Sequence, residues 1–386
     1  MTDLEYKMDL EYLYFALQKH PLLLTNEYKR MCFEQLYLNQ KNKKYDYKSF
    51  INTATELTTF FQDGHTNIEI PYMSKDRCLR LKCCWSEKDN NAFILMEQYD
   101  DIPEKSKIIA IEDVTIENTI SMISSQIPHE NIFLVKSRMI LYPYLNYHIF
   151  SERNLKLFFG KKEEYLISFL VNGKIIKKKI PLSQYDGFLD FPSDKSFLSY
   201  EIHKKAVVMH LNSCICNEKY IATLKKLAHI CKEKQIPSFI LDLSQNMGGN
   251  SAVIDKFIKF INIKYFRRYE MIDFSSGEAN YIVSRQDLIE NDREDICLPN
   301  EIYCKVSYNT FSSARTFAVT LKDNGIAKII GTKTGGKPNS YGMPQKAIMP
   351  ISKIRFRVSR CYFLRPDATM DNAITLTPDF DTFVDS

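Results

Sequence analysis

The sequence predicts a multidomain α/β protein, and three observations lead to this fold class. The chain has 386 residues, more than one ordinary hydrophobic core accommodates. Apolar residues make up 45% and charged residues 26%, as in ordinary soluble proteins. The apolar pattern changes along the chain from helical spacing to short strands, and then to strands alternating with helices. We therefore expect an N-terminal helical region in residues 1–75, a small β-rich domain in 76–195 and an α/β core in 196–386.

The first region reads as helical. Residues 10–17 place four apolar side chains at the i, i+3, i+4 and i+7 positions of one helical face. Two further helices are expected over 26–40 and 47–62. Gly64 suits the end of the last helix, and an alternating strand follows it.

The middle region reads as short strands separated by polar turns. Strands are expected over 92–99, 107–116, 164–171 and 174–182, and a helix around 115–127. A densely basic run over 160–180 alternates with apolar positions, which predicts the solvated face of a hairpin. The stretch "FLDFPSDKS" at 188–196 is typical of a linker.

The last region alternates strands and helices, which predicts α/β layering around a mainly parallel sheet. Strands are expected over 205–213, 238–243, 302–308 and 327–331, and helices over 217–234, 251–261 and 313–325. The charged stretch 284–300 is expected to be a surface insertion.

Charge and cysteine usage argue against several function classes. The net charge is +5, but the basic residues are not gathered in one stripe, so nucleic-acid binding is not expected. The ten cysteines form no CxxC pair, which argues against a zinc site. The N-terminus has acids where a signal peptide needs bases, and no apolar run reaches the roughly 18 residues of a membrane span. We therefore expect a cytoplasmic protein with free thiols and no membrane partner.

Two turns in the last region carry candidate chemistry. Ser312 and Ser313 lie where a strand turns into a helix, in "NTFSSARTFA". Taken alone, such a serine is more often a helix N-cap, but the same turn can hold a nucleophile above the sheet, with the helix N-terminus stabilising an oxyanion. Gly248 and Gly249 follow another strand. They allow either a turn with positive φ or an N–H group aimed at developing negative charge.

Two further residues are candidate bases. His65 follows a glycine at a predicted helix end, where a histidine is more often structural or solvated. Lys337 lies in the glycine-rich loop "IGTKTGGKPNSYG", where a surface lysine is the ordinary case. A phosphate-binding loop, and with it a nucleotide-binding protein, is disfavoured because Pro338 stands where that motif needs Ser or Thr.

Together these segments resemble the C-terminal processing peptidases and their tricorn-core relatives. The matching stretches are "ILDLSQNMGGN", with a serine where arginine is usual, "FSSARTFAVTLKDNGIAKIIGTKTGGK", and "DGHT", which is similar to tricorn-like members. The resemblance implies a serine endopeptidase with a crotonase-like α/β core, a peptide or protein substrate, and no metal or cofactor. The stretch "IPEKSKIIAIEDVTIEN" resembles the family's PDZ-like segment, although its usual glycine-rich loop is not visible.

The resemblance assigns roles residue by residue. The nucleophile falls on Ser312, and the oxyanion-binding N–H groups on Ser313 and on Gly248 or Gly249. Arg315 stands where a glutamate is usual.

The resemblance leaves two candidate bases. The lysine of processing peptidases lies 25 positions after the serine, and 337 − 312 = 25 gives Lys337. The histidine of tricorn-like members falls on His65, which we favour because "DGHT" fits that pattern and Pro338 departs from the other. The orienting acid of tricorn-like members falls near Asp371, where glutamate is expected.

The alternative function is a non-catalytic protein that binds a ligand or peptide on the same fold. Retention of the serine, histidine, lysine and glycine pair favours the enzyme. The sequence leaves the substrate and the oligomeric state open, a homo-oligomer included.

Overall fold

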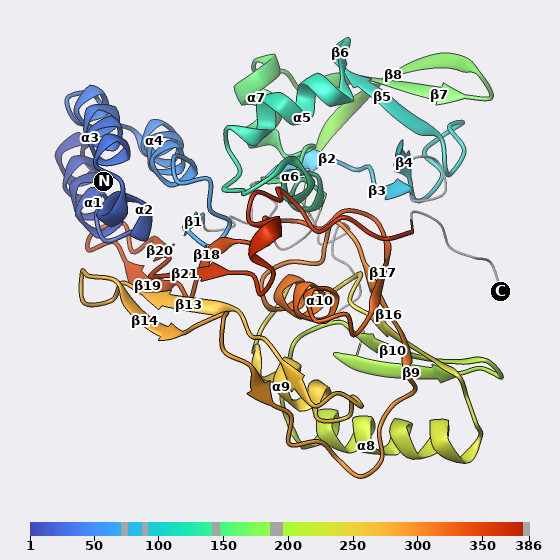
Figure 1. Cartoon of the computed structure of the whole chain (residues 1–386). Coiled ribbons are helices and arrows are strands. Elements are labelled where there is room, and N and C mark those ends of the chain that lie inside the picture. The colour runs from blue at the N-terminus through green and yellow to red at the C-terminus, as the bar shows by residue number, and fades with distance from the viewer. Residues whose placement is uncertain (71–75, 87–91, 141–146, 186–195, 381–386) are drawn as a thin grey trace.

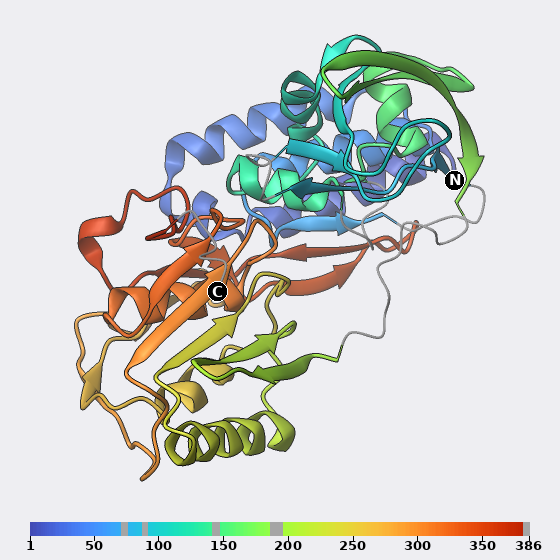
Figure 2. The same ribbon diagram turned by 90° about the vertical axis from the view of Figure 1, so that its right-hand side faces the viewer.

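The computed structural model describes residues 1–70, 76–86, 92–140, 147–185 and 196–380. Figure 1 shows the N-terminal helices and the β-rich middle region above the sheet of the C-terminal region. Turned by 90°, the first two regions again lie together on one side, with the sheet and helix α8 on the other (Figure 2). Among the described residues, buried apolar side chains gather in one large cluster in each region. The predicted linker 188–196 lies outside the described residues except for Ser196.

The N-terminal region consists of helices α1 (Asp3–Leu17), α2 (Pro21–Thr25), α3 (Glu27–Lys41) and α4 (Tyr47–Thr59). Helices α1, α3 and α4 confirm the three that were expected, whereas the five-residue α2 was not. α1 begins at a capping box formed by Thr2 and Glu5, and α4 at one formed by Asp46. The buried face of α1 includes Leu10 and Leu13, which pack in one cluster with Phe356 near the C-terminus.

The middle region is an antiparallel sheet with helices at its side. Its strands run in the order β2 (Arg77–Leu79), β8 (Lys174–Gln184), β7 (Glu164–Val171), β5 (Lys107–Ile111), β4 (Ala92–Leu95) and β3 (Cys83–Ser86), with β6 (Val114–Thr115) beside β5. Its helices are α5 (Ile116–Ser124), α6 (Ile132–Arg138) and α7 (Glu152–Phe159). The basic run forms the β7–β8 hairpin, as expected. The short helices α6 and α7 were not expected.

The C-terminal region contains the mainly parallel sheet that the sequence predicts. The strand order is β17 (Lys328–Gly331), β16 (Glu301–Val306), β11 (Ser238–Asp242), β10 (Ala206–Leu211) and β9 (Leu198–Ile202). All neighbours are parallel except the edge strand β9, which was not expected. The helices are α8 (Glu218–Glu233), α9 (Ala252–Ile258) and α10 (Ser313–Asp323), and α10 packs on β16 and β17. Inward-facing Val207, Met209 and Leu211 alternate along β10, as a strand requires.

Smaller sheets join the regions. One runs β1 (Asn67–Glu69), β20 (Arg355–Val358) and β19 (Gln345–Ile348). Another runs β14 (Asn280–Val283), β13 (Glu270–Asp273), β21 (Cys361–Leu364) and β18 (Ser340–Gly342). The predicted insertion 284–300 contains β15 (Ile289–Glu290), which pairs with β12 (Tyr265–Phe266), and a 3₁₀ turn spans Ala368–Met370. Because β1 pairs with β20, the segment just before β1 is held against the C-terminal region.

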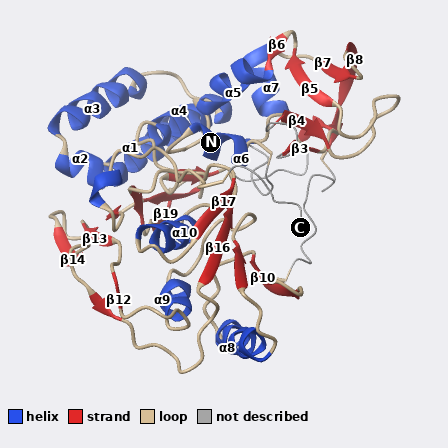
Figure 3. Cartoon of the chain, turned by 45° about the vertical axis from the view of Figure 1, so that its right-hand side comes forward, coloured by secondary structure: helices blue, strands red, loops and turns tan. Residues whose placement is uncertain are grey.

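Helix α6 lies where the middle region meets the other two (Figure 3). All ten cysteines are free thiols. Within the described ranges, no helix is both long and apolar enough to cross a bilayer.

Candidate active site

Two turns meet at one edge of the C-terminal sheet. They follow β11 and β16, which are parallel neighbours, so both turns leave the same ends of their strands. The hydroxyl of Thr310 donates to the carbonyl of Leu243 at 2.8 Å, and the N–H of Phe311 donates to the carbonyl of Asn246 at 3.1 Å. These bonds fix the serine turn against the glycine turn.

Ser312 is held in a strained backbone conformation. Its φ is 52° and its ψ is −129°, and a positive φ outside glycine costs on the order of 1–3 kcal/mol. Ser312 precedes α10, yet its side chain makes no capping hydrogen bond. Instead its Oγ lies 2.9 Å from Nε2 of His65. The helix-cap interpretation of this serine is therefore wrong.

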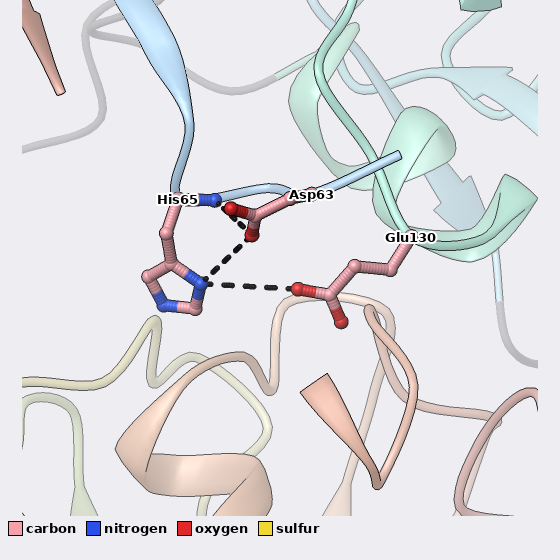
Figure 4. A group of neighbouring side chains, drawn as sticks. All are labelled: Asp63, His65 and Glu130. Carbon is pink, nitrogen blue, oxygen red and sulfur yellow. Dashed lines mark hydrogen bonds and ion pairs between the residues drawn. The ribbon is translucent and has the colours of Figure 1, made fainter. Parts of the chain in front are cut away.

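His65 lies in the turn between α4 and β1. Its ring stacks on Phe311, with centroids 4.8 Å apart. Nδ1 lies 3.5 Å from Oδ1 of Asp63 and 3.8 Å from Oε1 of Glu130, as Figure 4 shows. Both separations exceed a hydrogen bond, and Nδ1 of His65 and Oε1 of Glu130 are buried with no hydrogen-bond partner among the described residues.

Asp63 is buried and strongly hydrogen-bonded. Its Oδ2 accepts from the hydroxyls of Thr66 at 2.7 Å and Ser359 at 2.6 Å, and lies 3.2 Å from Nε2 of His20. Its Oδ1 accepts from the backbone N–H of His65 at 2.9 Å. Burial alone would raise the pKa of the Asp63 carboxyl, but the hydrogen bonds with His20 and His65 outweigh burial and hold that pKa well below its usual range. Asp63 is therefore an anion that fixes the backbone around His65.

Glu130 was not predicted from the sequence. It lies in the loop before α6 and is buried, and its Oε2 accepts from Nη1 of Arg315 at 2.9 Å and from the backbone N–H of Lys337 at 2.7 Å. Burial raises the pKa of the Glu130 carboxyl, while the adjacent Arg315 acts in the opposite direction. Arg315, which stands where the resemblance has glutamate, thus neutralises a glutamate from another part of the chain. Its guanidinium also donates to Ser340.

The glycine turn presents N–H groups beside Ser312. The N–H of Gly248 donates to Oδ1 of Asn246 at 2.8 Å, so it is already occupied. No hydrogen bond joins the N–H of Gly249 or of Ser313 to another residue in the described part of the chain. A Cβ on Gly248 would lie 3.0 Å from the Ser313 nitrogen, which places the two turns in contact.

The other two predicted residues are not joined to the Ser312–His65 pair. Among the described residues, no hydrogen bond connects the Lys337 side chain to Ser312, and none connects Asp371 to His65. Asp371 instead receives two bonds from Arg285, at 2.6 and 2.8 Å. The prediction that Asp371 is the acid that orients His65 is therefore wrong, because the guanidinium of Arg285, from the predicted insertion, binds this carboxylate.

A cavity of about 470 Å³ opens beside Ser312 and His65. Much of its lining is apolar and includes Ile254, Phe266, Tyr269, Met271, Val283 and Phe363. An ion pair between Arg268 and Asp255, at 3.0 Å, lies in its wall.

Asp63, His65 and Glu130 also lie close enough to share a cation, since their donor atoms are within 4.8 Å of one another. Hydrogen bonds from protein groups already engage both oxygens of Asp63, and Arg315 neutralises Glu130. We therefore interpret the group as carboxylates around an imidazole rather than as ligands of a metal.

Comparisons with known proteins identify the family of the C-terminal region. Residues 205–382 match the model of peptidase family S41, a stretch that contains Ser312 and the glycine pair but not His65 or Glu130. No curated protein matches the chain.

Several solved structures share the fold. A mutant of CPAF has a TM-score of 0.69 at 10% identity, over 97% of this chain and 92% of that chain. Mature CPAF complexed with lactacystin has a TM-score of 0.66 at 12% identity, over 98% and 94%. At such identities, the likeness to these solved structures shows the fold alone. The family of the C-terminal region comes from the family model. Residues 205–382 form a domain of peptidase family S41.

Proposed function

We propose that the chain is a serine endopeptidase in which Ser312 is the nucleophile and His65 the general base. The observation that carries the proposal is the 2.9 Å contact between Oγ of Ser312 and Nε2 of His65, made by a serine in a strained turn. A serine becomes a useful nucleophile when an adjacent base removes its proton. A structural helix cap would need neither the strain nor this partner.

The reaction follows from the positions of these atoms. Oγ of Ser312 attacks the substrate carbonyl carbon as its proton passes to Nε2 of His65, and the N–H groups of Ser313 and Gly249 bind the resulting oxyanion. Gly249 is preferred to Gly248 because Asn246 occupies the N–H of Gly248. His65 then protonates the leaving amine, and a water molecule that His65 deprotonates hydrolyses the acyl-enzyme.

The proton on Nδ1 needs an acceptor. For Nε2 to accept from Ser312, the neutral ring must carry its proton on Nδ1. Asp63 and Glu130 both face this atom, so the imidazolium that forms during attack is stabilised by nearby negative charge. Lys337 is not required in this mechanism.

The cavity beside Ser312 supports a peptide substrate. Its apolar lining suits an apolar side chain next to the scissile bond. A non-catalytic binding protein could use the same cavity but would leave Ser312 unreactive. Hydrolysis of denatured casein tests the choice: the wild-type protein should cleave it and Ser312→Ala should not. Equal residual cleavage by both proteins would contradict the proposal.

We propose further that residues 76–195 are a degenerate PDZ-like domain, and that 196–386 form a crotonase-like core. In support, the β5–β6 pair precedes the short helix α5, and a cavity of about 850 Å³ beside them is lined by Trp85, Phe93, Ile116, Ile120 and Tyr308. Such a groove would take an extended peptide by strand addition. We propose a cytoplasmic location because all ten cysteines are free thiols.

A further inference from the structure

Glu130 and His65 form a buried pair in which each partner lacks a hydrogen bond. Oε1 of Glu130 and Nδ1 of His65 are 3.8 Å apart, and neither atom makes a hydrogen bond among the described residues, although Oδ1 of Asp63 lies 3.5 Å from the same Nδ1. Buried polar atoms are rarely left unpaired, because the lost hydration costs about 1–3 kcal/mol. A closure of about 0.8 Å would bring them to the ordinary length near 3.0 Å. Such bonds are often long before substrate binds.

Asp63 is the less suitable acceptor for the Nδ1 proton. Its Oδ2 already accepts from Thr66 and Ser359 and faces His20, and its Oδ1 accepts the backbone N–H of His65. By contrast, Oε1 of Glu130 is open. Counted by hydrogen bonds, Oε1 of Glu130 has both of its acceptor sites open, whereas Oδ1 of Asp63 has one left, so Glu130 has the greater free capacity toward the ring.

The segment that carries Glu130 is tied to three loops at the candidate site. Three contacts anchor it: Nη2 of Arg138 to the carbonyl of Gly64 at 2.8 Å, the hydroxyl of Ser137 to Oδ1 of Asn309 at 2.8 Å, and Nδ2 of Asn131 to the carbonyl of Gly336 at 2.9 Å. They reach the histidine turn, the serine turn and the glycine-rich loop in that order. These contacts hold the segment of the middle region that carries Glu130 beside the candidate site.

Several charged groups surround the His65 ring. The two carboxylates facing it are Asp63 and Glu130. His20 contacts Asp63, Arg315 and the backbone N–H of Lys337 contact Glu130, and Arg138 binds the carbonyl of Gly64. Arg315 is the buried partner of Glu130, at 2.9 Å, and favours its ionised form.

We propose that Glu130 is a positioning residue of the peptidase site, which holds His65 through its Nδ1 proton, and that Arg315 keeps Glu130 ionised for this role. The inference rests on the proposed function. The middle region would thus supply a residue on which the catalytic step depends, and the role of Arg315 would be to keep that residue ionised.

The test compares Glu130→Gln with Asp371→Asn, a matched change in another arginine-bound carboxylate. Fluorophosphonate labelling of Ser312 is followed across pH, and the His65 ring is titrated by NMR. Glu130→Gln should slow labelling at neutral pH at least about tenfold, since losing the acid of a triad costs up to about 10⁴-fold. It should also shift two midpoints to lower pH: the midpoint of the rise in labelling rate with pH, and the midpoint of the NMR titration of the His65 ring. The reason is that the variant lacks the Glu130 carboxylate, which stabilises the imidazolium. Asp371→Asn should leave both midpoints at the wild-type pH.

A fold control is needed because Glu130→Gln leaves Arg315 buried without its counter-ion. The double variant Glu130→Gln/Arg315→Met removes both charges and should show a smaller shift to lower pH, because the cation that opposes protonation of His65 is removed together with the nearer anion. If both Glu130 variants melt cooperatively and keep the wild-type midpoints, the inference is overturned while the proposed function stands. If the wild-type protein shows no labelling that depends on Ser312, the proposed function fails, and the inference with it.

Discussion

Replacing Gly248 by alanine tests the contact between the two turns. An added Cβ would lie 2.7 Å from Cβ of Ser312, 3.0 Å from the nitrogen of Ser313 and 3.1 Å from the carbonyl oxygen of Phe311. The backbone φ of Gly248 is +108°, which side chains rarely adopt. Gly277 is the matched control, since its φ is +92° and an added Cβ would meet nothing within 4 Å.

Gly248→Ala and Gly277→Ala both place an alanine in a backbone conformation with positive φ, but only Gly248→Ala also creates a steric clash. Left-handed backbone costs about 1–2 kcal/mol for an L-residue, so Gly277→Ala should lose about that much stability. Gly248→Ala should lose a further 1–3 kcal/mol or so from overpacking. Because the clash moves Ser312 and the N–H of Ser313, kcat should fall by about 10²–10³-fold, as when one oxyanion donor is removed.

Urea unfolding and casein hydrolysis measure the two effects separately. Gly277→Ala should be less stable but retain wild-type kcat. Wild-type kcat in Gly248→Ala, or an equal loss of activity in Gly277→Ala and Gly248→Ala, would show that the contact between the turns does not position Ser312.

Three further predictions concern the neighbouring side chains. Ser313→Ala should keep most activity in casein hydrolysis, because the backbone N–H and not the hydroxyl is used; loss equal to Ser312→Ala would contradict this. His65→Ala should fall to the Ser312→Ala level and Lys337→Met should keep substantially more, since removing the true base costs about as much as removing the nucleophile; the reverse order would make Lys337 the base. Asp63→Asn should lower the free energy of unfolding by about 3–5 kcal/mol at neutral pH, because the groups that donate hydrogen bonds to the buried carboxylate would then surround a neutral amide. The pKa of Asp63 is depressed on folding, so wild-type stability should fall as pH drops from the ordinary value near 4 toward the folded pKa, and urea titrations of Asp63→Asn should lack that component.

Local patterns in the sequence predicted much of the fold. The apolar spacing over 10–17 predicts α1, and the serine and glycine turns follow from strands that end at the same edge of a parallel sheet. The short helices α2, α6 and α7 were missed because five to eight residues complete barely two turns of periodicity.

The missing parts of the site depend on contacts between distant segments. Glu130 carries no local signal, since its role arises from meeting Arg315 and His65 in space. Asp371 was misplaced because Arg285, in a stretch interpreted as a surface insertion, binds its carboxylate. Hydrogen-bond capacity, which decides between such carboxylates, is visible only in three dimensions.

Covalent labelling tests most directly whether Ser312 is a nucleophile activated by His65. Treatment with a fluorophosphonate probe, followed by mass spectrometry of proteolytic fragments, locates the covalent adduct. We expect one adduct, on Ser312, that forms in the wild-type protein and in Lys337→Met and is lost in Ser312→Ala and His65→Ala. An adduct on another residue, or labelling that survives Ser312→Ala, would contradict this expectation.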